Sequence, residues 1–378
     1  PQPQLAPQPN LAQSVREWRL LDPAVGSGHF LLVAFDLLFA LYQEEAAQRG
    51  EQGQPQWSSR AIVERILEHN LHGIDLDPRA VQIAAASLWL KAQRAAPGAQ
   101  PRALHLVASN LRLSGLQQDD AELKQLRQQV EQEAGIPGAL VDQVLGALRG
   151  ADHLGSLLQV DRAVDEALAQ HEEAVATRRG GQQLSLLGGA APAPVDFEAS
   201  AARRSLVDKL EALLARHTSG DDLGLRLRGE QLAAGVRFIR MMQPGQYDVV
   251  VGNPPYQGTQ KMVEAEYIQE HYEKGKADLY AAFLERGLQL VRDCGLVSMV
   301  SMDGWMFLKQ FSDLRAFILK QHSLRTVTDL FWCAFEQMRH ATVAMYVIQS
   351  APDRDAGSVG LVPGPREERD ESIPGLQR

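Results

Sequence analysis

Apolar positions along the chain follow two different periods. Short apolar runs at 19–23, 71–77 and 103–109 each end in a turn that contains glycine or small polar residues. Longer segments with apolar residues three and four positions apart cover 30–47 and 78–93. Short bounded runs predict strands, and the helical spacing predicts helices. Strands that alternate with helices predict a parallel sheet with helices on both faces.

The same alternation returns nearer the C-terminal end. The expected elements there are strands at 247–251 and 295–301, helices at 278–293 and 307–320, and two last strands at 323–331 and 342–349. We therefore expect an α/β, Rossmann-like fold with a mostly parallel seven-stranded sheet. Between the two parts, residues 117–240 have a helical pattern rich in Gln, Leu, Ala and Glu, which a glycine-rich loop at 180–194 interrupts. This stretch predicts a helical insertion within the sheet domain.

Composition limits the class of protein. The chain has 378 residues, of which 45% are hydrophobic and 22% charged, as is usual for a soluble globular protein. It contains no apolar run long enough to cross a bilayer, and its start lacks the pattern of a signal peptide. Cys294 and Cys333 match no metal-ligand spacing and predict reduced thiols in a cytoplasmic protein. The net charge of −9 argues against strong nonspecific binding of nucleic acid without a local basic face or a basic partner domain.

The turn Asp22–Phe30 lies between the first strand and the first helix. Gly26 and Gly28 allow a tight turn and a close approach of ligand to backbone. The third glycine of the dinucleotide fingerprint is missing, because Leu31 stands in its place, and no phosphate loop is present. The acidic Asp22 suits the amino and sulfonium groups of S-adenosylmethionine better than a pyrophosphate. A plain strand-to-helix turn is the alternative interpretation.

Two further turns can complete a cofactor site. Asp75 ends the second strand and can accept hydrogen bonds from a ribose diol, while Leu76 can pack on an adenine ring. Asp77 is better explained as the cap of the next helix. After the third strand, the carboxamide of Asn110 can bond the cofactor adenine or can be an ordinary turn residue.

The segment Asn253–Tyr256, Asn-Pro-Pro-Tyr, directly follows an apolar strand. Pro254 and Pro255 stiffen the turn and keep their carbonyl acceptors while lacking N–H donors. Together with the Asn253 carboxamide oxygen they form a site that accepts hydrogen bonds from an amino group. Tyr256 offers a flat face for an extruded base. A rigid strand-exit loop is the structural alternative.

We find no motif for a metal. HExxH and CxxC are missing, and His69 and His72 are better explained by a helical turn or the start of a strand. We therefore expect no metal and no membrane segment.

With these motifs the chain resembles the N6-adenine DNA methyltransferases in which the cofactor motif precedes the catalytic motif. The resemblance covers about residues 18–110 and 245–350. It implies S-adenosylmethionine as the cofactor and double-stranded DNA as a partner. The cofactor-binding residues that it implies are Asp22, Pro23, Ala24, Gly26, Gly28, Phe30, Asp75, Leu76, Asn110 and Asn253. The catalytic residues that it implies are Asn253, Pro254, Pro255 and Tyr256, and many relatives carry Asp where Asn110 stands.

The stretch 276–319 and the insertion with Leu154–Leu158 are similar to the PglX methyltransferases of BREX phage-defence systems, and type IIG restriction-modification enzymes share this domain. The likeness implies BREX proteins as further partners. It implies that Asp278, Tyr280 and Phe283 lie just past the catalytic loop. It also makes Phe335 a second aromatic against the flipped base, although core packing explains Phe335 equally well.

The resemblance divides the chain into five parts. These are a flexible N-terminal segment (1–16), a cofactor-binding half (17–116), a helical insertion (117–242), a catalytic half (243–350) and a tail or linker (351–378). Relatives usually have a segment before the first motif and a large C-terminal DNA-reading region, so we expect this piece to be weak or inactive alone. Two other interpretations stay open, a methyltransferase acting on RNA or protein glutamine, and a non-catalytic S-adenosylmethionine-binding scaffold or sensor of a defence complex.

Overall fold

A computed structural model describes most of the chain in two compact units. The described ranges are 14–110, 137–170, 233–259, 264–331, 342–352 and 357–361, with residues 124, 128, 131, 132, 208 and 262. The first unit comprises Pro1–Ala108 and Pro244–Arg378, and the second comprises Ser109–Gln243. The insertion predicted at 117–242 lies within the second unit.

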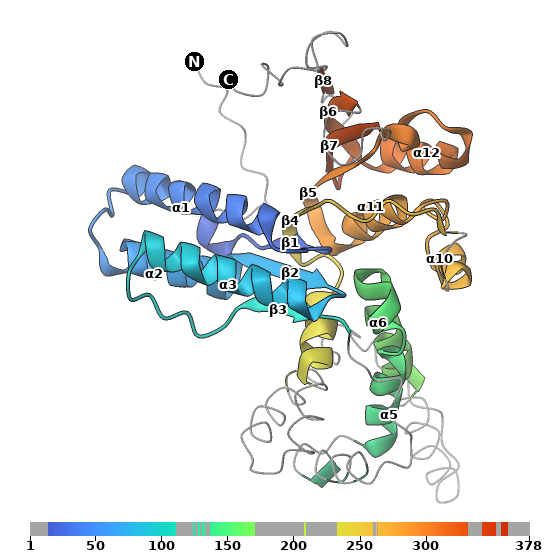
Figure 1. Cartoon of the computed structure of the whole chain (residues 1–378), viewed down its shortest axis with the longest axis horizontal. Helices are drawn as coiled ribbons and strands as arrows, with labels where there is room; N and C mark the ends of the chain where they lie inside the picture. Colours follow the sequence, from blue (N-terminus) through green and yellow to red (C-terminus); the bar gives the residue numbers. More distant parts are fainter. Residues whose placement is uncertain are drawn as a thin grey trace, which may run out of the picture. The chain divides into compact units, whose positions relative to one another are not determined.

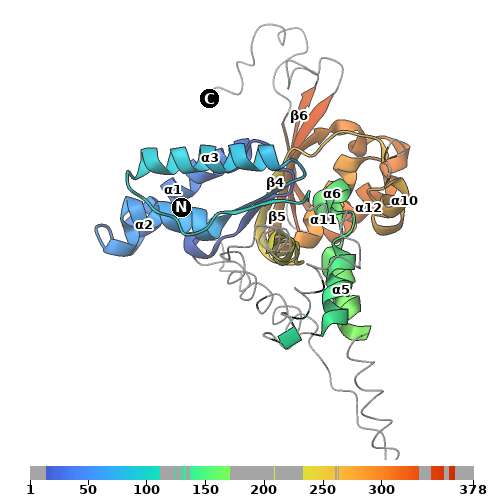
Figure 2. The ribbon, with the colours of Figure 1, turned by 60° about the horizontal axis from the view of Figure 1, so that its bottom comes forward.

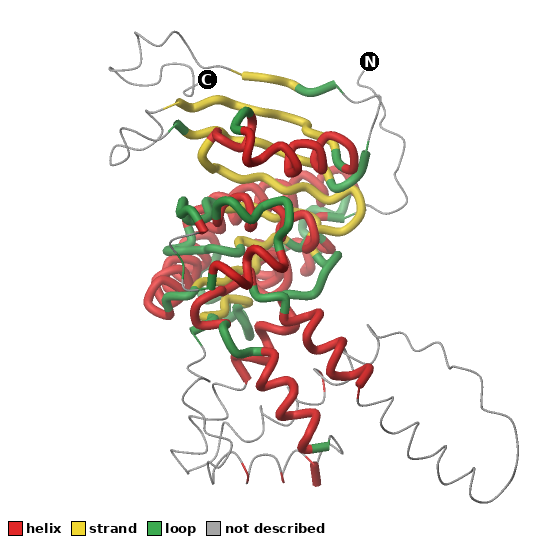
Figure 3. Tube along the Cα trace, turned by 90° about the vertical axis from the view of Figure 1, so that its right-hand side faces the viewer, coloured by secondary structure: helices red, strands yellow, loops and turns green. Residues whose placement is uncertain are grey.

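In its described residues, the first unit is built on one mixed sheet of eight strands in the order β3-β2-β1-β4-β5-β7-β6-β8 (Figure 1). The strands are β1 (Leu20–Asp22), β2 (Leu71–Asp75), β3 (His105–Ala108), β4 (Tyr247–Gly252), β5 (Val291–Met302), β6 (Ser323–Phe331), β7 (Val343–Gln349) and β8 (Val359–Leu361). The strands β3, β2, β1, β4 and β5 are parallel, and β7 pairs antiparallel with both β5 and β6. Figure 3 shows the long strands beside one another. The expected α/β sheet is confirmed, with one strand more than expected.

Helices cover both faces of this sheet. They are α1 (His29–Arg49), α2 (Ser59–Arg65), α3 (Pro78–Ala95), α10 (Ala265–His271), α11 (Leu279–Leu290) and α12 (Ser312–Gln321). Short 3-10 turns are η1 (Val15–Glu17), η2 (Pro55–Trp57), η7 (Asp303–Met306) and η8 (Lys309–Phe311), and η3 (Ile66–Asn70) is a π-helical turn that extends α2. Figure 2 shows α1–α3 grouped together and α10–α12 in a second group.

The packing shows which face each group covers. Leu31, Leu71 and Leu88 belong to one buried cluster, so α1 and α3 pack on the face of β2 that carries Leu71. Gly287 of α11 lies against Val250 and Val297, which point to the opposite face because side chains alternate along a strand. The sheet therefore presents apolar side chains on both of its faces, and helices pack on both.

Three predicted elements have different bounds in the structure. The helix predicted at 278–293 ends at Leu290, because Cys294 takes a left-handed φ of 65° and a register shift lets Val291 pair with Tyr247. The helix predicted at 307–320 starts only at Ser312, after two 3-10 turns. The segment 351–378, predicted as a tail or linker, contributes β8, which pairs with β6.

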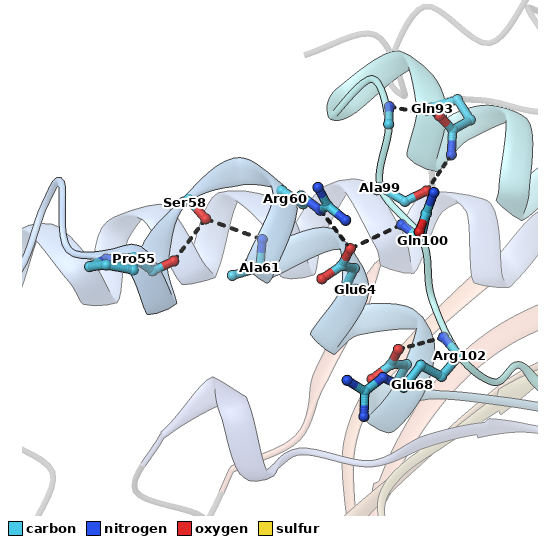
Figure 4. Close-up of polar contacts among 11 residues, drawn as sticks. Pro55, Ser58, Arg60, Ala61, Glu64, Glu68, Gln93, Ala99, Gln100 and Arg102 are labelled. Atoms are coloured by element: carbon cyan, nitrogen blue, oxygen red, sulfur yellow. Dashed lines mark hydrogen bonds and ion pairs between the residues drawn. The ribbon is translucent and has the colours of Figure 1, made fainter.

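The connection from α3 to β3 is fixed by α2 and η3 (Figure 4). Glu64 accepts hydrogen bonds from the backbone N of Gln100 and from Nε of Arg60, both at 2.9 Å. Glu68 accepts from the backbone N of Arg102 at 2.6 Å. The bond from Gln100 and the neighbouring Arg60 lower the pKa of Glu64. Two acidic side chains thus hold the segment that leads into β3.

The described residues of the second unit are mostly helical. It contains α5 (Gly138–Ala147), α6 (Ala151–Leu154) and the 3-10 turn η5 (Gly155–Leu157), and residues 160–170 and 233–241 are also helical. The segment Leu154–Leu158 is buried throughout. Buried small and apolar residues give this segment a packing role.

Candidate active site

Three loops meet at one edge of the sheet in the first unit. The strands β2, β1 and β4 are neighbours and run parallel, with Leu20 paired to both Leu71 and Val249. The carboxyl ends of parallel neighbours lie side by side, and such edges form the usual ligand crevice of open α/β sheets. Asp22 and Asp75 are the last residues of β1 and β2, and Asn253 directly follows β4, so the structure brings together the three predicted motifs.

Asp22 contributes a buried carboxyl group to this edge. The residue is 1% exposed, and its Oδ1 accepts a hydrogen bond from the backbone N of Ala24 at 3.1 Å. A Cβ at Gly252 would lie 3.1 Å from the same oxygen, so glycine there leaves room for the carboxylate. Burial raises the pKa of Asp22 to about 7; the bond from Ala24 opposes that shift and Asp75 adds to it. The group is poised to ionise when a cation approaches.

The two glycines of the first turn have different tasks. Both have positive φ, 52° at Gly26 and 89° at Gly28. A Cβ on Gly28 would lie 3.0 Å from Cβ of Ala84, so this glycine permits contact between α1 and α3. A Cβ on Gly26 would meet no atom within 4 Å. The open space therefore lies at Gly26, where a ligand can approach the backbone.

Asp75 ties the first two loops together. Its Oδ2 accepts from the backbone N of Gly26 at 2.8 Å, and its Oδ1 accepts from the backbone N of Asp77 at 2.9 Å. Asp77 in turn caps α3 by accepting from the N of Arg79 at 2.9 Å, as predicted. Leu76 between them is 40% exposed, which leaves an apolar surface beside the carboxylate.

The Asn253–Tyr256 loop is closed by its own tyrosine. The Tyr256 hydroxyl donates to Oδ1 of Asn253 at 2.5 Å and lies 3.3 Å from the carbonyl oxygen of Val300. Asn253 and Pro255 are exposed, Pro254 is buried and Tyr256 is half-buried. Burial raises the pKa of Tyr256 to about 12, so its hydroxyl keeps its proton. Oδ1 of Asn253, the acceptor predicted for a target amine, is therefore occupied by the Tyr256 hydroxyl. This hydroxyl has the Val300 carbonyl oxygen beside it as a second acceptor.

Asp278, which precedes α11, and Tyr280 in its first turn support this loop. Asp278 caps α11, and its Oδ1 also accepts from the backbone N of Gln257 at 3.2 Å. The Tyr280 ring meets the Tyr256 ring edge-on, with centroids 6.4 Å apart and an interplanar angle of 90°. Asp278 therefore fixes the chain just after the motif, and Tyr280 fixes the ring of the motif. The sequence signal was an Asp before a helix, which indicates a cap but not its contact with Gln257.

The other predicted residues are placed as follows. Phe30 is half-buried in the first turn of α1, Pro23 is buried and Ala24 half-buried, and Phe283 is buried in α11. Asn110 is exposed, two residues after β3. Phe335 and Cys333 lie outside the described residues.

The opposite edge of the sheet has a different character. His72 lies there, buried, with its ring stacked on His105 at 4.8 Å and its Nε2 at 3.2 Å from Nη2 of Arg19. Burial first, then the charge of Arg19, holds the pKa of His72 well below its ordinary value. A pocket of about 430 Å³ opens near this edge, between Trp18, Leu296 and Val347 among others. It does not include any residue of the three loops.

In the ranges that the structure describes, no helix is long and apolar enough to cross a membrane. Within the same ranges, His, Cys, Asp and Glu side chains form no group of three or more that suits a metal ion.

Known proteins match the chain in both of its sequence halves. The model of the Eco57I restriction-modification methylase family matches residues 69–333, and that of the MmeI DNA-methyltransferase domain matches residues 5–113. The adenine-specific methyltransferase PglX of Lacticaseibacillus casei is 29% identical over 304 residues, which are 80% of this chain and 21% of that protein. The adenine-specific methyltransferase BrxX of Escherichia coli O9:H4 is 28% identical over 328 residues, 85% of this chain and 24% of that protein.

The chain thus spans about a quarter or less of the length of these relatives. A solved structure of the type IIL restriction-modification enzyme MmeI in complex with DNA aligns with a TM-score of 0.41 and 14% identity, over 90% of this chain and 32% of that one. The Eco57I model extends over more than half of the residues and includes Asp75 and Asn253–Tyr256. The chain therefore belongs to the Eco57I restriction-modification methylase family.

Proposed function

We propose that the chain is the catalytic domain of an S-adenosylmethionine-dependent DNA methyltransferase that acts on the N6 amine of adenine, in BREX-type phage defence or restriction-modification. The observation that carries the proposal is the meeting of Asp22, Asp75 and Asn253 at the carboxyl ends of neighbouring strands. Family membership and the names of the relatives PglX and BrxX support it.

The first two loops fit S-adenosylmethionine. Asp22 supplies a buried carboxyl group with a pKa near 7, and such a group suits a positively charged ligand. The carboxylate of Asp75 suits a ribose diol, the exposed Leu76 suits a flat apolar ring, and Gly26 leaves open space between them. When bound, the cofactor supplies an activated methyl group, and the protein supplies position and electrostatics.

The third loop fits an exocyclic amine. The lone pair of the adenine N6 is delocalised into the ring, so the amine is a poor nucleophile. Acceptors that hold its hydrogens favour a pyramidal nitrogen and return the lone pair to it, and we assign this task to Oδ1 of Asn253 and the Pro254 carbonyl. Tyr256 supplies a face for the extruded base. Its hydroxyl can turn to the Val300 carbonyl when the amine arrives, since that oxygen is already 3.3 Å away.

Double-stranded DNA is then the substrate, BREX proteins are further partners, and the cytoplasm is the expected compartment. The net charge of −9 means that phosphate contacts must come from a local group of cations or from a partner. Asn110 and Phe335 remain proposed as a cofactor contact and a second base contact.

The test is transfer of tritiated methyl from S-adenosylmethionine to unmethylated phage DNA. Extract of cells that lack DNA methylation is added in a parallel reaction to supply partners. Asn253→Ala and Asp75→Ala are run beside the native chain, and the labelled base is identified by chromatography. We expect label in N6-methyladenine, lost in Asn253→Ala.

Other outcomes separate the alternatives. Label in RNA or in protein glutamine, but not in DNA, would keep the chemistry and change the substrate. Cofactor binding by calorimetry that Asp75→Ala abolishes, with no methyl transfer to any polymer, would favour a scaffold or sensor. Absence of both binding and transfer would contradict the proposal.

A further inference from the structure

A pair of large apolar side chains protrudes beside the candidate site. Phe307 is 62% exposed and Leu308 is 45% exposed, in the turn between η7 and η8 that follows β5. The sequence pattern predicted a helix here, which would have placed this pair in regular packing. Exposure of a phenylalanine to water is unfavourable, by roughly 1.5–3 kcal/mol relative to its burial.

Hydrogen bonds on both sides of the pair hold the turn that carries it. Nη1 of Arg315 in α12 donates to the carbonyl oxygens of Trp305 at 2.8 Å and of Leu308 at 2.7 Å. The backbone N of Leu308 donates to Gly304 at 2.9 Å. Bonds on both sides of Phe307 therefore fix the backbone that carries its ring.

The turn is also joined to the Asn253–Tyr256 loop. The buried ring of Phe311, at the end of the turn, lies 5.6 Å from the Tyr280 ring. A Cβ on Gly304, at the start of the turn, would lie 3.7 Å from the Tyr280 hydroxyl. Tyr280 meets Tyr256 edge-on at 6.4 Å. Phe307 and Leu308 thus lie between Gly304 and Phe311, which both lie close to Tyr280. Tyr280 in turn supports Tyr256.

We propose that Phe307 and Leu308 form a wedge that enters duplex DNA beside the target adenine and packs on the bases left behind when that adenine is extruded. This inference rests on the proposed function. Extrusion removes stacking from the neighbouring bases, and inserted apolar side chains replace it in other proteins that distort DNA. Lys309, exposed directly after the pair, can meet a phosphate.

The position of the pair favours DNA over a protein partner. The turn that carries it lies against Tyr280 at both ends, through Gly304 and Phe311. Tyr280 in turn meets Tyr256, the residue that we propose faces the extruded base.

The test compares methyl transfer to duplex phage DNA with transfer to the same DNA made single-stranded by heating. A single strand has no stacked gap to fill, so the wedge matters only for the duplex. For Phe307→Ala combined with Leu308→Ala, we expect the duplex rate to fall about tenfold and the single-strand rate to stay within about twofold. Phe307→Trp, which keeps a stacking ring, should retain the duplex rate. Leu37→Ala removes an equally exposed residue of α1 (62%) and should change neither rate.

Each contrary outcome has a definite meaning. An unchanged duplex rate in the double variant overturns the wedge and leaves the proposed function standing. An equal loss on both substrates also overturns it, because the turn would then support the site itself. A native chain that methylates single strands only would contradict the wedge as well. A native chain that methylates neither form of DNA would contradict the proposed function, and the wedge with it.

Discussion

At the amino ends of the central strands, polar side chains join neighbouring segments of the sheet, whereas at the carboxyl ends they bond to loop backbone beside open space. Asp248 accepts from the backbone N of Arg19 at 2.8 Å and pairs with Arg292, while Arg19 also lies over the Tyr247 ring. At the other end, Asp75 accepts from the backbone of two turns, and a Cβ at Gly26 beside it would meet nothing.

The difference separates two uses of polar residues within one sheet. Side chains that bond across neighbouring strands fix strand register, since loss of such a partner leaves a buried group unpaired. A strand-end acid held by backbone amides keeps its orientation toward the ligand side of the sheet. We therefore expect substitutions at the amino edge to lower stability and substitutions at the carboxyl edge to lower activity.

The largest effect should come from Asn253→Ala. Loss of a preorganised group aimed at the reacting amine should lower kcat by about 1,000-fold. Asn253 is exposed, so the free energy of unfolding should change by less than about 0.5 kcal/mol. Steady-state methyl transfer and urea unfolding measure the two quantities. A large loss of stability would contradict the expectation that substitutions at the carboxyl edge lower activity and not stability.

Next in size is Asp248→Ala at the amino edge. The variant leaves Arg292 and the backbone N of Arg19 without their partner, and we expect about 3 kcal/mol lower stability in urea unfolding. Affinity for S-adenosylmethionine, measured by calorimetry below the unfolding transition, should stay the same. A fall in affinity without a loss of stability would show that this cluster serves the site directly.

Gly28→Ala should have a smaller effect, mainly on stability, and its control variant tests cofactor binding as well. The left-handed φ of 89° and the 3.0 Å approach to Ala84 predict about 2 kcal/mol lower stability. Gly26→Ala is the matched control, since its φ is also positive but its Cβ would meet no atom. The control should lose less stability, yet should still weaken cofactor binding because it fills the open space. Equal stability losses in the two variants would contradict the packing role of Gly28.

The smallest expected effect is a pH dependence at Asp22. Its pKa of about 7 means that the free protein holds a neutral carboxyl group below pH 7, whereas a cationic ligand favours the carboxylate. Affinity for S-adenosylmethionine should therefore rise about tenfold from pH 6 to pH 8, and calorimetry in two buffers should detect proton release.

Stability of the free chain should move in the opposite direction. The unfolded chain ionises Asp22 at its ordinary, lower pKa, so the folded state loses stability as pH rises from about 4 to 7. Asp22→Asn should remove this contribution from unfolding curves and flatten the pH dependence of binding. A wild-type affinity that does not change with pH would rule out a cation beside this carboxyl group.

The sequence predicted the α/β class and the juxtaposition of the three loops because both depend on strand order and apolar period. It could not predict that the helix from Asp278 stops at Leu290, since this depends on the left-handed Cys294 and on pairing of Val291 with Tyr247. The hydrogen bonds that Glu64 and Glu68 accept from the chain before β3 could not be predicted either, because both residues look like exposed helix residues in the sequence.

The site was predicted at the level of residue type. Asp22, Asp75 and Asn253 were proposed from their places at or just after strand ends, which any parallel sheet brings together. The bond from Tyr256 to Asn253 and the edge contact of Tyr280 were not, because they depend on side-chain orientation within a turn. The exposed Phe307 was predicted as helical, since apolar spacing alone does not show where a helix begins.

The pairing of β1 with β4 joins parts of the chain that are far apart, as the bond between Arg19 and Asp248 spans 229 positions. The entropy of closing such a loop grows only with the logarithm of its length, by about 0.6 kcal/mol for each doubling. The chain can therefore lengthen, shorten or exchange the 109–243 unit with little penalty to the sheet. That freedom makes the unit a natural place for lineages of this enzyme family to diverge while the edge that carries the three loops stays the same.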